Sequence, residues 1–432
     1  MISPQNISSP LKRLIYTNSL VVPFIFFSIY AILGLKHTGE EDSLFYWIVA
    51  AISSLAAYVF IFFSFLNRKI LNLKELLLYA FPISIVFLFI LSGNYRDLAY
   101  QSIILFVLFV IPAAYIGIEL GRERKLNEYI NLFYLVSLLI SAGLFMTIPV
   151  AISTPVTELV DQFAGGHYQA MSYFASFAFL ITIIYWSFYS GKNSVTKTLF
   201  YLLLIFGQIA AIILSGGRGG LVVIAAGGLV LIYLNFTRKM FIPFLSLIVL
   251  ILGYGINELV NYDFGYQDII GGTDIEGNRA FVGASRLVSY IDAGGIDFSQ
   301  TSNREIYFLD SIRYIQERPL FGYGLFDRID ENPSVFYGRP GFFYPHNLFL
   351  EILLHGGIVY LAFWLSILGI FAYKFFKILY YDKSQSIIIA PAVYSFVLLM
   401  FSGTYLQEAF FWFTIFYVLS FPTKDLSFSS KK

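Results

Sequence analysis

The sequence lacks cysteine altogether and is poor in charge: among its 432 residues, only 13% are Asp, Glu, Lys or Arg. Without cysteine, the chain cannot form disulfides or iron–sulfur clusters and cannot use a thiolate as a nucleophile. The charged share is roughly half that of a soluble domain. The net charge of +1 leaves no basic excess to hold a phosphate backbone. These absences exclude a disulfide-stapled domain, a thiol enzyme and a nucleic-acid-binding protein.

Apolar residues are abundant instead. They make up 58% of the chain, with 47 Phe and 32 Tyr, and the mean hydropathy is +0.73. A soluble core cannot hold so many apolar side chains, whereas a bilayer takes about 20 residues for each helical crossing. We therefore predict an all-α integral membrane protein, a single polytopic domain over residues 1–432 with about twelve transmembrane helices. The predicted spans are 14–35, 44–66, 75–92, 98–118, 129–152, 168–190, 198–214, 219–236, 240–260, 347–373, 386–403 and 407–421.

The distribution of Lys and Arg predicts the orientation of these helices, because cytoplasmic loops carry the excess of basic residues. If the loops alternate between two sides, one side holds 18 basic residues, whereas the short loops of the other side hold only Lys36, Arg96 and Arg218. We therefore predict that both termini are cytoplasmic. We also expect the first run to be a retained helix, because it is too long for the core of a signal peptide. The 18 residues are Lys12, Arg13, Arg68, Lys69, Lys74, Arg122, Arg124, Lys125, Lys192, Lys197, Arg238, Lys239, Lys374, Lys377, Lys383, Lys424, Lys431 and Lys432.

The remaining seven basic residues fall in residues 261–346, which we predict to be a large, partly helical extracytoplasmic loop between helices 9 and 10. A guanidinium binds phosphate oxygens at two points, whereas a lysine acts as a single point charge. The alternative is that these arginines form ordinary salt bridges with acidic residues of the same segment. The segment contains no lysine, and its arginines are Arg279, Arg286, Arg304, Arg313, Arg318, Arg328 and Arg339.

One of these arginines occupies an unusual position. Ser302 and Glu305 form a Ser-x-x-Glu capping box, which predicts a helix that Pro319 ends. Arg304 then lies in the first turn, where the helix dipole disfavours a positive charge. Either Glu305 offsets this cost, or an anionic ligand binds the helix N-terminus and the guanidinium together; we favour the ligand. The apolar residues of the predicted helix are Ile306, Leu309, Ile312 and Ile315.

A glycine-rich turn joins predicted spans seven and eight. Its sequence, Ser-Gly-Gly-Arg-Gly-Gly over residues 215–220, is not a P-loop, because the Gly-Lys-Ser/Thr ending and the preceding strand are both missing. Four glycines let the backbone approach a neighbour closely while Arg218 projects from the membrane surface. The alternative is a tight helical hairpin with a snorkelling arginine.

The third feature is Tyr344-Pro345-His346-Asn347, at the start of predicted span ten. Pro and Asn are typical of helix starts, and the positive end of a helix dipole disfavours the imidazolium. A neutral His346 can accept a proton and act as a general base; the alternative is a hydrogen-bonded interfacial histidine. His355, nine residues on, falls about 180° around the same helix, so it is a poorer candidate for the general base. The neighbouring aromatics either stack on sugars or form the interfacial belt, which we favour; they are Phe336, Tyr337, Phe342, Phe343 and Tyr344.

The chain resembles the bacterial O-antigen ligase and polymerase family in an ordered set of short motifs, and in the expected topology over the whole chain. The motifs are the 215–220 turn, Arg304, Pro-Leu-Phe-Gly-Tyr-Gly at 319–324, His-Asn-Leu-Phe-Leu-Glu at 346–351, and Gly356-Gly357. The chain departs from the family in having adjacent glycines at 356–357, in having His355 where an acidic residue is common, and in its longer interval between Arg218 and Arg304.

The resemblance implies a glycosyltransferase in the bacterial cytoplasmic (inner) membrane that works without metal or other cofactor. The implied donor is an undecaprenyl-diphosphate-linked glycan on the periplasmic face, and the acceptor is another glycan or a lipid A core. Arg218 and Arg304 would then bind the diphosphate, and His346 would activate or position the acceptor hydroxyl. Further expected partners are membrane lipid and a chain-length regulator. Asn347, Arg339 and Tyr344 complete the predicted substrate-binding set.

Two other classes stay open from the residues alone. A transporter or flippase of lipid-linked oligosaccharide should show ionisable residues near the bilayer midplane, or interrupted helices in matching halves. Pro82 and Pro112 fall inside two early runs, but no matching pair occurs in the second half. A purely structural membrane protein would leave the glycine–arginine turn and the His-Asn segment unexplained. Polymerase and ligase use the same donor, so the sequence does not separate them.

Overall fold

The computed structural model describes residues 21–31, 33, 44–66, 73–92, 103–124, 126, 129–153, 168–191, 194–215, 218–234, 304–324 and 345–422. The regular structure within these ranges is helical throughout, without a strand. Predicted span 240–260, Ser302, Arg339 and Tyr344 lie outside them, as do the side chains of Arg218 and Arg304.

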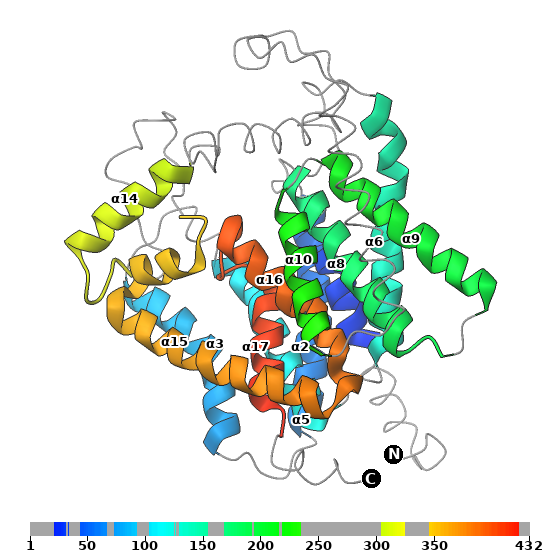
Figure 1. The fold of residues 1–432 in the computed structure, drawn as a ribbon. Helices are drawn as coiled ribbons and strands as arrows, with labels where there is room; N and C mark the ends of the chain where they lie inside the picture. Colours follow the sequence, from blue (N-terminus) through cyan, green and yellow to red (C-terminus); the bar gives the residue numbers. More distant parts are fainter. Residues whose placement is uncertain are drawn as a thin grey trace, which may run out of the picture.

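The helices form one bundle with α14 beside it (Figure 1). An unlabelled first helix, Val21–Ala31, precedes them. The labelled elements are α2 (Leu44–Leu66), α3 (Leu73–Ser92), π-helix η2 (Phe106–Val110), α5 (Ile111–Glu123), α6 (Ile130–Ser153), α8 (Tyr168–Phe188), α9 (Val195–Ser215), α10 (Arg218–Tyr233), α14 (Arg304–Glu317), α15 (Leu348–Tyr381), the 3-10 helix η5 (Lys383–Ile388), α16 (Ile389–Phe401) and α17 (Ala409–Ser420).

Six helical stretches in the described part of the chain are long and apolar enough to cross a membrane: Leu44–Phe65, Ile103–Glu123, Met171–Phe188, Val195–Ile212, Leu348–Tyr381 and Lys383–Phe401. Shorter apolar helices are Val21–Ala31, Ile130–Met146, Gly219–Tyr233 and Ala409–Ser420. The predicted multi-pass helical membrane protein is confirmed at this level. The count of twelve spans and the placement of the long loop stay predictions.

The structure departs from the predicted spans in the regularity of the helices. The expected helix 98–118 contains a π-helical turn directly before Pro112, which lies in the first turn of α5. Proline has no N–H to donate to the preceding turn, so the hydrogen-bond ladder changes register there. The expected helix 347–373 extends as α15 to Tyr381 and is broken at Gly357.

The centre of the bundle is α17, whose residues from Ala409 to Val418 are all buried. It packs most closely on α5, at Gly117 and Gly121. A Cβ at Gly117 would collide with the carbonyl oxygen of Phe413, and one at Gly121 with that of Tyr417. Small residues four apart allow two helix backbones to approach closely within a membrane, so this glycine pair fixes the α5–α17 contact.

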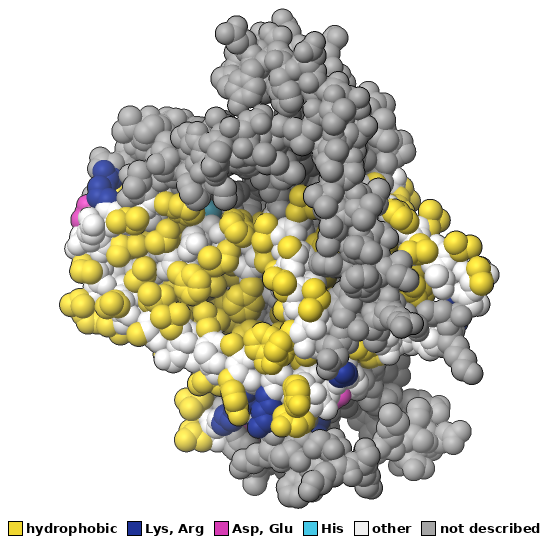
Figure 2. Space-filling model, viewed as in Figure 1, with side chains coloured by type: hydrophobic (Ala, Val, Ile, Leu, Met, Phe, Trp, Pro, Cys, Tyr) yellow, Lys and Arg dark blue, Asp and Glu magenta, His cyan; other side chains and the backbone are white. Residues whose placement is uncertain are grey.

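One end of the bundle is basic. The Arg124 guanidinium donates to the Pro422 carbonyl over 2.9 Å, and the Lys374 ammonium donates to the carbonyls of Leu419 and Phe421 over 2.6 and 2.8 Å. Figure 2 shows Lys and Arg side chains gathered there, below the apolar surface. We call this the basic end; it contains the C-termini of α5, α15 and α17. The opposite, distal end contains the first turn of α15 and residues 402–408.

Candidate active site

The three predicted catalytic residues all lie at helix starts. Arg218 is the first residue of α10, Arg304 is the first residue of α14, and His346 directly precedes the N-cap of α15. Tyr233, the last residue of α10, contacts the Phe376 ring in the second half of α15, with centroids 5.5 Å apart. The C-termini of α10 and α15 therefore lie together, and their N-termini lie toward the distal end (Figure 1).

His346 has an unusual backbone conformation. Its φ is +51°, in the left-handed region that non-glycine residues rarely adopt. Residues held in such a conformation cost on the order of 1–3 kcal/mol and cluster at functional sites. The next residue, Asn347, caps α15: its Oδ1 accepts hydrogen bonds from the N–H groups of Phe349 and Leu350 over 3.0 and 3.2 Å. The cap and the turn together fix where the His346 backbone lies.

The glycines after Arg218 provide close packing against α8. A Cβ at Gly219 would collide with the Tyr173 ring, and one at Gly220 with the Ser172 backbone. The Gly220 N–H also donates to Ser172 Oγ over 3.2 Å. These contacts hold the first turn of α10, and thus the Arg218 backbone, against α8. The expected close backbone approach is seen at Gly219 and Gly220, whereas residues 216–217 and the Arg218 side chain lie outside the described residues, so the choice between a projecting and a snorkelling Arg218 stays a prediction.

α15 is broken at Gly357, where φ is +62° and ψ is −163°. Two intrahelical hydrogen bonds are missing at this break, from Ile358 N–H to the Leu354 carbonyl and from Val359 N–H to the His355 carbonyl. The turn at 319–324 supplies a backbone partner for each of the four groups. Tyr323 and Gly324 donate to the carbonyls of Leu354 and His355 over 2.7 and 2.8 Å; Ile358 and Val359 donate to those of Pro319 and Leu320 over 2.8 and 3.4 Å.

Glycines make this docking possible on both sides. Gly322, at φ +63°, lies against the Leu354 carbonyl oxygen, and a Cβ there would come within 2.5 Å of it. A Cβ at Gly357 would collide with the Leu320 carbonyl. The Pro-Leu-Phe-Gly-Tyr-Gly and Gly356-Gly357 motifs, 33 residues apart between Gly324 and Gly357, are thus two halves of one contact.

Two arginines at the exposed side of α14 lie over the rings of neighbouring tyrosines. The Arg318 guanidinium lies over the Tyr323 ring, 4.5 Å from its centroid, and Arg313 lies 4.9 Å from that of Tyr314. Tyr323 Oη donates to Glu317 Oε2 over 2.6 Å. Burial, followed by this bond to the carboxylate, raises the pKa of Tyr323 to about 12. Of the seven arginines of this segment, Arg313 and Arg318 therefore have aromatic partners.

A buried carboxylate, Glu351, ties the first turn of α15 to residues 402–408. Its side chain is 1% exposed. One carboxylate oxygen accepts a hydrogen bond from the Thr404 hydroxyl, and the other accepts from the Tyr405 N–H over 3.4 Å. Thr404 Oγ1 in turn accepts from the Leu406 N–H over 3.2 Å. Because a buried carboxylate is stable only with such partners, this network holds the loop against the helix that begins beside His346.

His355, one helical turn after Glu351, also contacts residues 402–408. Its Nδ1 lies 2.9 Å from Tyr405 Oη, and the Trp412 indole N–H donates to the Tyr405 carbonyl over 2.6 Å. His355 therefore belongs to the packing of α15 on α17.

A second buried carboxylate, Glu408, caps α17 by accepting from the Phe410 N–H over 3.1 Å. Tyr30, from the first helix, donates to its other oxygen over 3.2 Å, and Tyr30 Oη also accepts from the Ala409 N–H over 3.2 Å. The distal end thus joins the first helix, α15 and α17 through two carboxylates.

Sequence reasoning missed these groups. Glu351, Thr404 and Glu408 are isolated polar residues in apolar runs, and their partners lie tens of residues away. The available signal was the spacing of Glu351 and His355, which places two ionisable residues on one face of a predicted span. The preference for His346 over His355 as the general base stays a prediction.

No group of three His, Asp or Glu side chains within the described ranges could hold a metal ion. In comparisons with known proteins, residues 199–365 match a protein-family model described as O-antigen ligase. No curated protein matches the chain. The matched region contains α10, α14 and the first turns of α15, and therefore all three predicted catalytic residues.

Proposed function

We propose that this protein is a membrane glycosyltransferase of O-antigen or surface-polysaccharide assembly, because residues 199–365 match a family model described as O-antigen ligase. It moves an undecaprenyl-diphosphate-linked glycan to an acceptor hydroxyl at the outer face of the bacterial cytoplasmic membrane. The acceptor is a second lipid-linked glycan if the protein is a polymerase, and a lipid A core if it is a ligase.

The observation that carries this proposal is the position of Arg218, Arg304 and His346 at three helix starts within the matched region. Helix N-termini favour anions because their N–H groups are unpaired and the dipole is positive there. A diphosphate leaving group is an anion of this kind. The 319–324 turn joins α14 to α15 through backbone hydrogen bonds, which supports a shared site for Arg304 and His346.

In the reaction that we propose, the acceptor oxygen attacks the anomeric carbon of the donor sugar, and the bond from that carbon to the diphosphate oxygen breaks. Undecaprenyl diphosphate leaves with the electron pair, and Arg218 and Arg304 stabilise the charge that develops on it. His346 takes or orients the hydroxyl proton. Asn347, Arg339 and Tyr344 contact the substrates. The bond energy comes with the donor, so the reaction needs no nucleotide, metal or other cofactor.

The basic end supports the proposed orientation. Arg122, Arg124, Lys374 and Lys383 lie at or beside the C-termini of α5 and α15, and cytoplasmic surfaces carry such residues. The distal end, with His346, then faces the periplasm. Twelve spans, cytoplasmic termini and an outer loop at 261–346 complete the proposed topology, with membrane lipid and a chain-length regulator as further partners.

The test is transfer by the purified protein, supplied with a lipid-linked oligosaccharide and an acceptor in lipid nanodiscs. We expect Arg218→Ala, Arg304→Ala and His346→Ala to abolish transfer without loss of folded protein, and Arg304→Lys to restore little, because a lysine cannot bind bidentately. Arg313→Ala, in the same helix as Arg304, is the matched control and should stay active. Full activity in all three alanine variants would refute the catalytic assignment.

The product distinguishes the remaining alternatives. A ladder of increasing repeats identifies a polymerase, and a single transfer of the whole glycan identifies a ligase. A flippase would move the labelled donor across a vesicle membrane without forming a glycosidic bond. The break in α15 is the kind of interruption that transporters show, but its open groups are bonded to the 319–324 turn.

A further inference from the structure

We propose that the docking of the 319–324 turn into the break of α15 sets the position of His346 relative to Arg304, with Gly322 and Gly357 as the positioning residues. The inference rests on the proposed function, which makes Arg304 and His346 partners in one reaction. In this proposal neither glycine touches the substrate; both act through the contact between the turn and α15.

The break divides α15 into two arms. The first arm, 348–356, begins at the Asn347 cap beside His346, and the second arm, 358–381, crosses the bundle. Figure 1 shows that the first arm and α14 both extend from the turn toward the middle of the molecule. α14 and the first arm of α15 are each a rigid helix, and they meet at the docked turn. The geometry of this contact therefore determines the separation of their far ends, where Arg304 and His346 lie.

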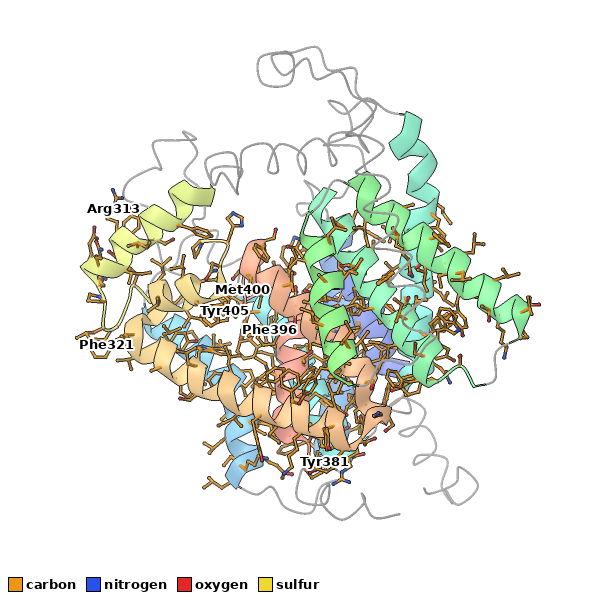
Figure 3. All side chains as sticks on the ribbon, in the orientation of Figure 1. Arg313, Phe321, Tyr381, Phe396, Met400 and Tyr405 are labelled. Carbon is orange, nitrogen blue, oxygen red and sulfur yellow. The ribbon has the colours of Figure 1, made fainter. Side chains whose placement is uncertain are left out.

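The surroundings of the break explain why the turn must dock. Ile358 and Val359 are 56% and 53% exposed, and Leu320 and Phe321 of the turn are 57% and 75% exposed. Figure 3 shows Phe321 at the tip of the turn, directed away from the bundle. Exposed apolar side chains therefore lie on both partners of the contact, two on α15 and two on the turn bonded to it. Open backbone groups are strongly disfavoured in lipid, so an undocked turn would leave two N–H and two C=O groups of α15 without partners.

Three arrangements of the break can be compared. The turn can be docked with one fixed geometry, or it can be undocked, which lipid disfavours. Alternatively, α15 can be continuous, which restores the two missing intrahelical bonds. The left-handed φ of Gly357 and the close approach of Leu320 select the bonded turn. Substitution of either glycine by alanine should shift the protein toward a straighter helix, which moves the first arm and His346.

The experiment combines kinetics with a distance measurement. We expect Gly357→Ala and Gly322→Ala to lower kcat roughly 10- to 100-fold, the range expected when reacting groups are misplaced by about 1 Å, with KM for the lipid-linked donor changed less than about 3-fold. Gly369→Ala is the matched control: this glycine lies in the second arm of α15, a Cβ there meets no atom within 4 Å, and the variant should behave as wild type. A glycine with a purely structural role would change the amount of folded protein but not kcat per folded molecule.

The absence of native cysteine allows nitroxide labels to be placed cleanly at Ile312→Cys in α14 and Phe349→Cys in the first arm, both exposed positions. We expect one narrow distance distribution in the otherwise unchanged chain, and a broadened or shifted one in both glycine variants. If those variants do not fold, Tyr323→Ala serves instead. It removes the ring contacts with Tyr314 and Arg318 and the bond to Glu317 at the surface, and should lower kcat about 3- to 10-fold.

The two proposals fail differently. A wild-type protein that transfers no glycan refutes the proposed function, while the label distances still test the docking. Unchanged distances in every variant that folds would overturn the inference whatever the activity. Altered distances with wild-type kcat would overturn it as well, because the position of His346 would then not depend on the turn.

Discussion

The α5–α17 contact and the break of α15 both depend on glycine, but for different physical reasons. Gly117 and Gly121 lie in a regular helix, and only the missing Cβ matters, because it lets two backbones touch. Gly322 and Gly357 have positive φ values and also lie against a backbone. The first contact is apolar, whereas the second consists of backbone hydrogen bonds. Apolar packing fixes the centre of the bundle, and polar contacts fix the break of α15.

The largest expected effect breaks the central contact. Gly117→Ala places a Cβ against the Phe413 carbonyl, where neither backbone can move aside without separating α5 from α17. We expect the variant to lose about 3 kcal/mol of folding stability or more, the upper end of the range for overpacking. Size-exclusion chromatography should show this as a loss of monodisperse protein. In an open helical position the same substitution is favourable by about 0.5–1 kcal/mol. Gly143→Ala in α6, where a Cβ meets no atom within 4 Å, is therefore the control, and equal behaviour of the two variants would contradict this account.

The next effect tests the distal end through Glu408. Glu408→Ala removes the buried acceptor of the Phe410 N–H and of the Tyr30 hydroxyl, which should cost about 2–4 kcal/mol.

Thermal unfolding in detergent should therefore show a lower midpoint in Glu408→Ala and a smaller change in Glu408→Gln. The glutamine keeps an acceptor for the Phe410 N–H and offers a donor to Tyr30. Equal midpoints in wild type and Glu408→Ala would show that this cap does not hold the distal end.

Glu351→Ala should cost about 2–4 kcal/mol, because it leaves the Thr404 hydroxyl and the Tyr405 N–H without an acceptor in a buried position. We expect a lower unfolding midpoint and faster proteolysis within residues 402–408. Glu351→Gln, which keeps one acceptor, should lie between wild type and alanine. If alanine is as stable as wild type, the carboxylate does not hold this loop.

The smallest effect concerns Tyr405→Phe, which removes the hydroxyl 2.9 Å from His355 Nδ1 and leaves the ring contacts in place. The loss of one neutral hydrogen bond corresponds to about 1 kcal/mol. We expect a small decrease in the unfolding midpoint, additive with Gly143→Ala and non-additive with His355→Ala. If the effects of Tyr405→Phe and His355→Ala on the midpoint are additive, the two side chains do not interact.

Much of the fold could be predicted from local sequence. Apolar runs locate the described helices, because burial in a bilayer depends on composition and length alone. Pro319 and the capping pattern predicted α14, which the structure places at Arg304–Glu317. Pro345 and Asn347 predicted the start of α15, where Asn347 is the N-cap. These features depend on residues within one or two turns of each other.

The break at Gly357 could not be predicted in the same way. Glycine is tolerated in membrane helices, so Gly356-Gly357 is compatible with a straight span. Only the turn at 319–324, whose backbone replaces the missing bonds, makes the break stable. Glu351 and Thr404 are separated by 53 residues, and nothing in either local sequence indicates the other. Contacts of this range depend on the tertiary arrangement, which periodicity does not describe.

The shortness of α17 has a consequence for the depth of the distal end. Twelve residues rise about 18 Å, against about 30 Å for the hydrocarbon layer. Neighbouring helices cover α17 on all sides, so lipid cannot thin around it to compensate. In the proposed topology, with its C-terminus at the cytoplasmic surface beside Lys374, α17 and the 402–408 loop end roughly 10 Å short of the opposite surface, by the same helix rise. Thr404, Tyr405 and Glu408 are then polar groups at the depth of the lipid tails, where their hydrogen bonds to Glu351, His355 and Tyr30 replace the water that lipid does not supply.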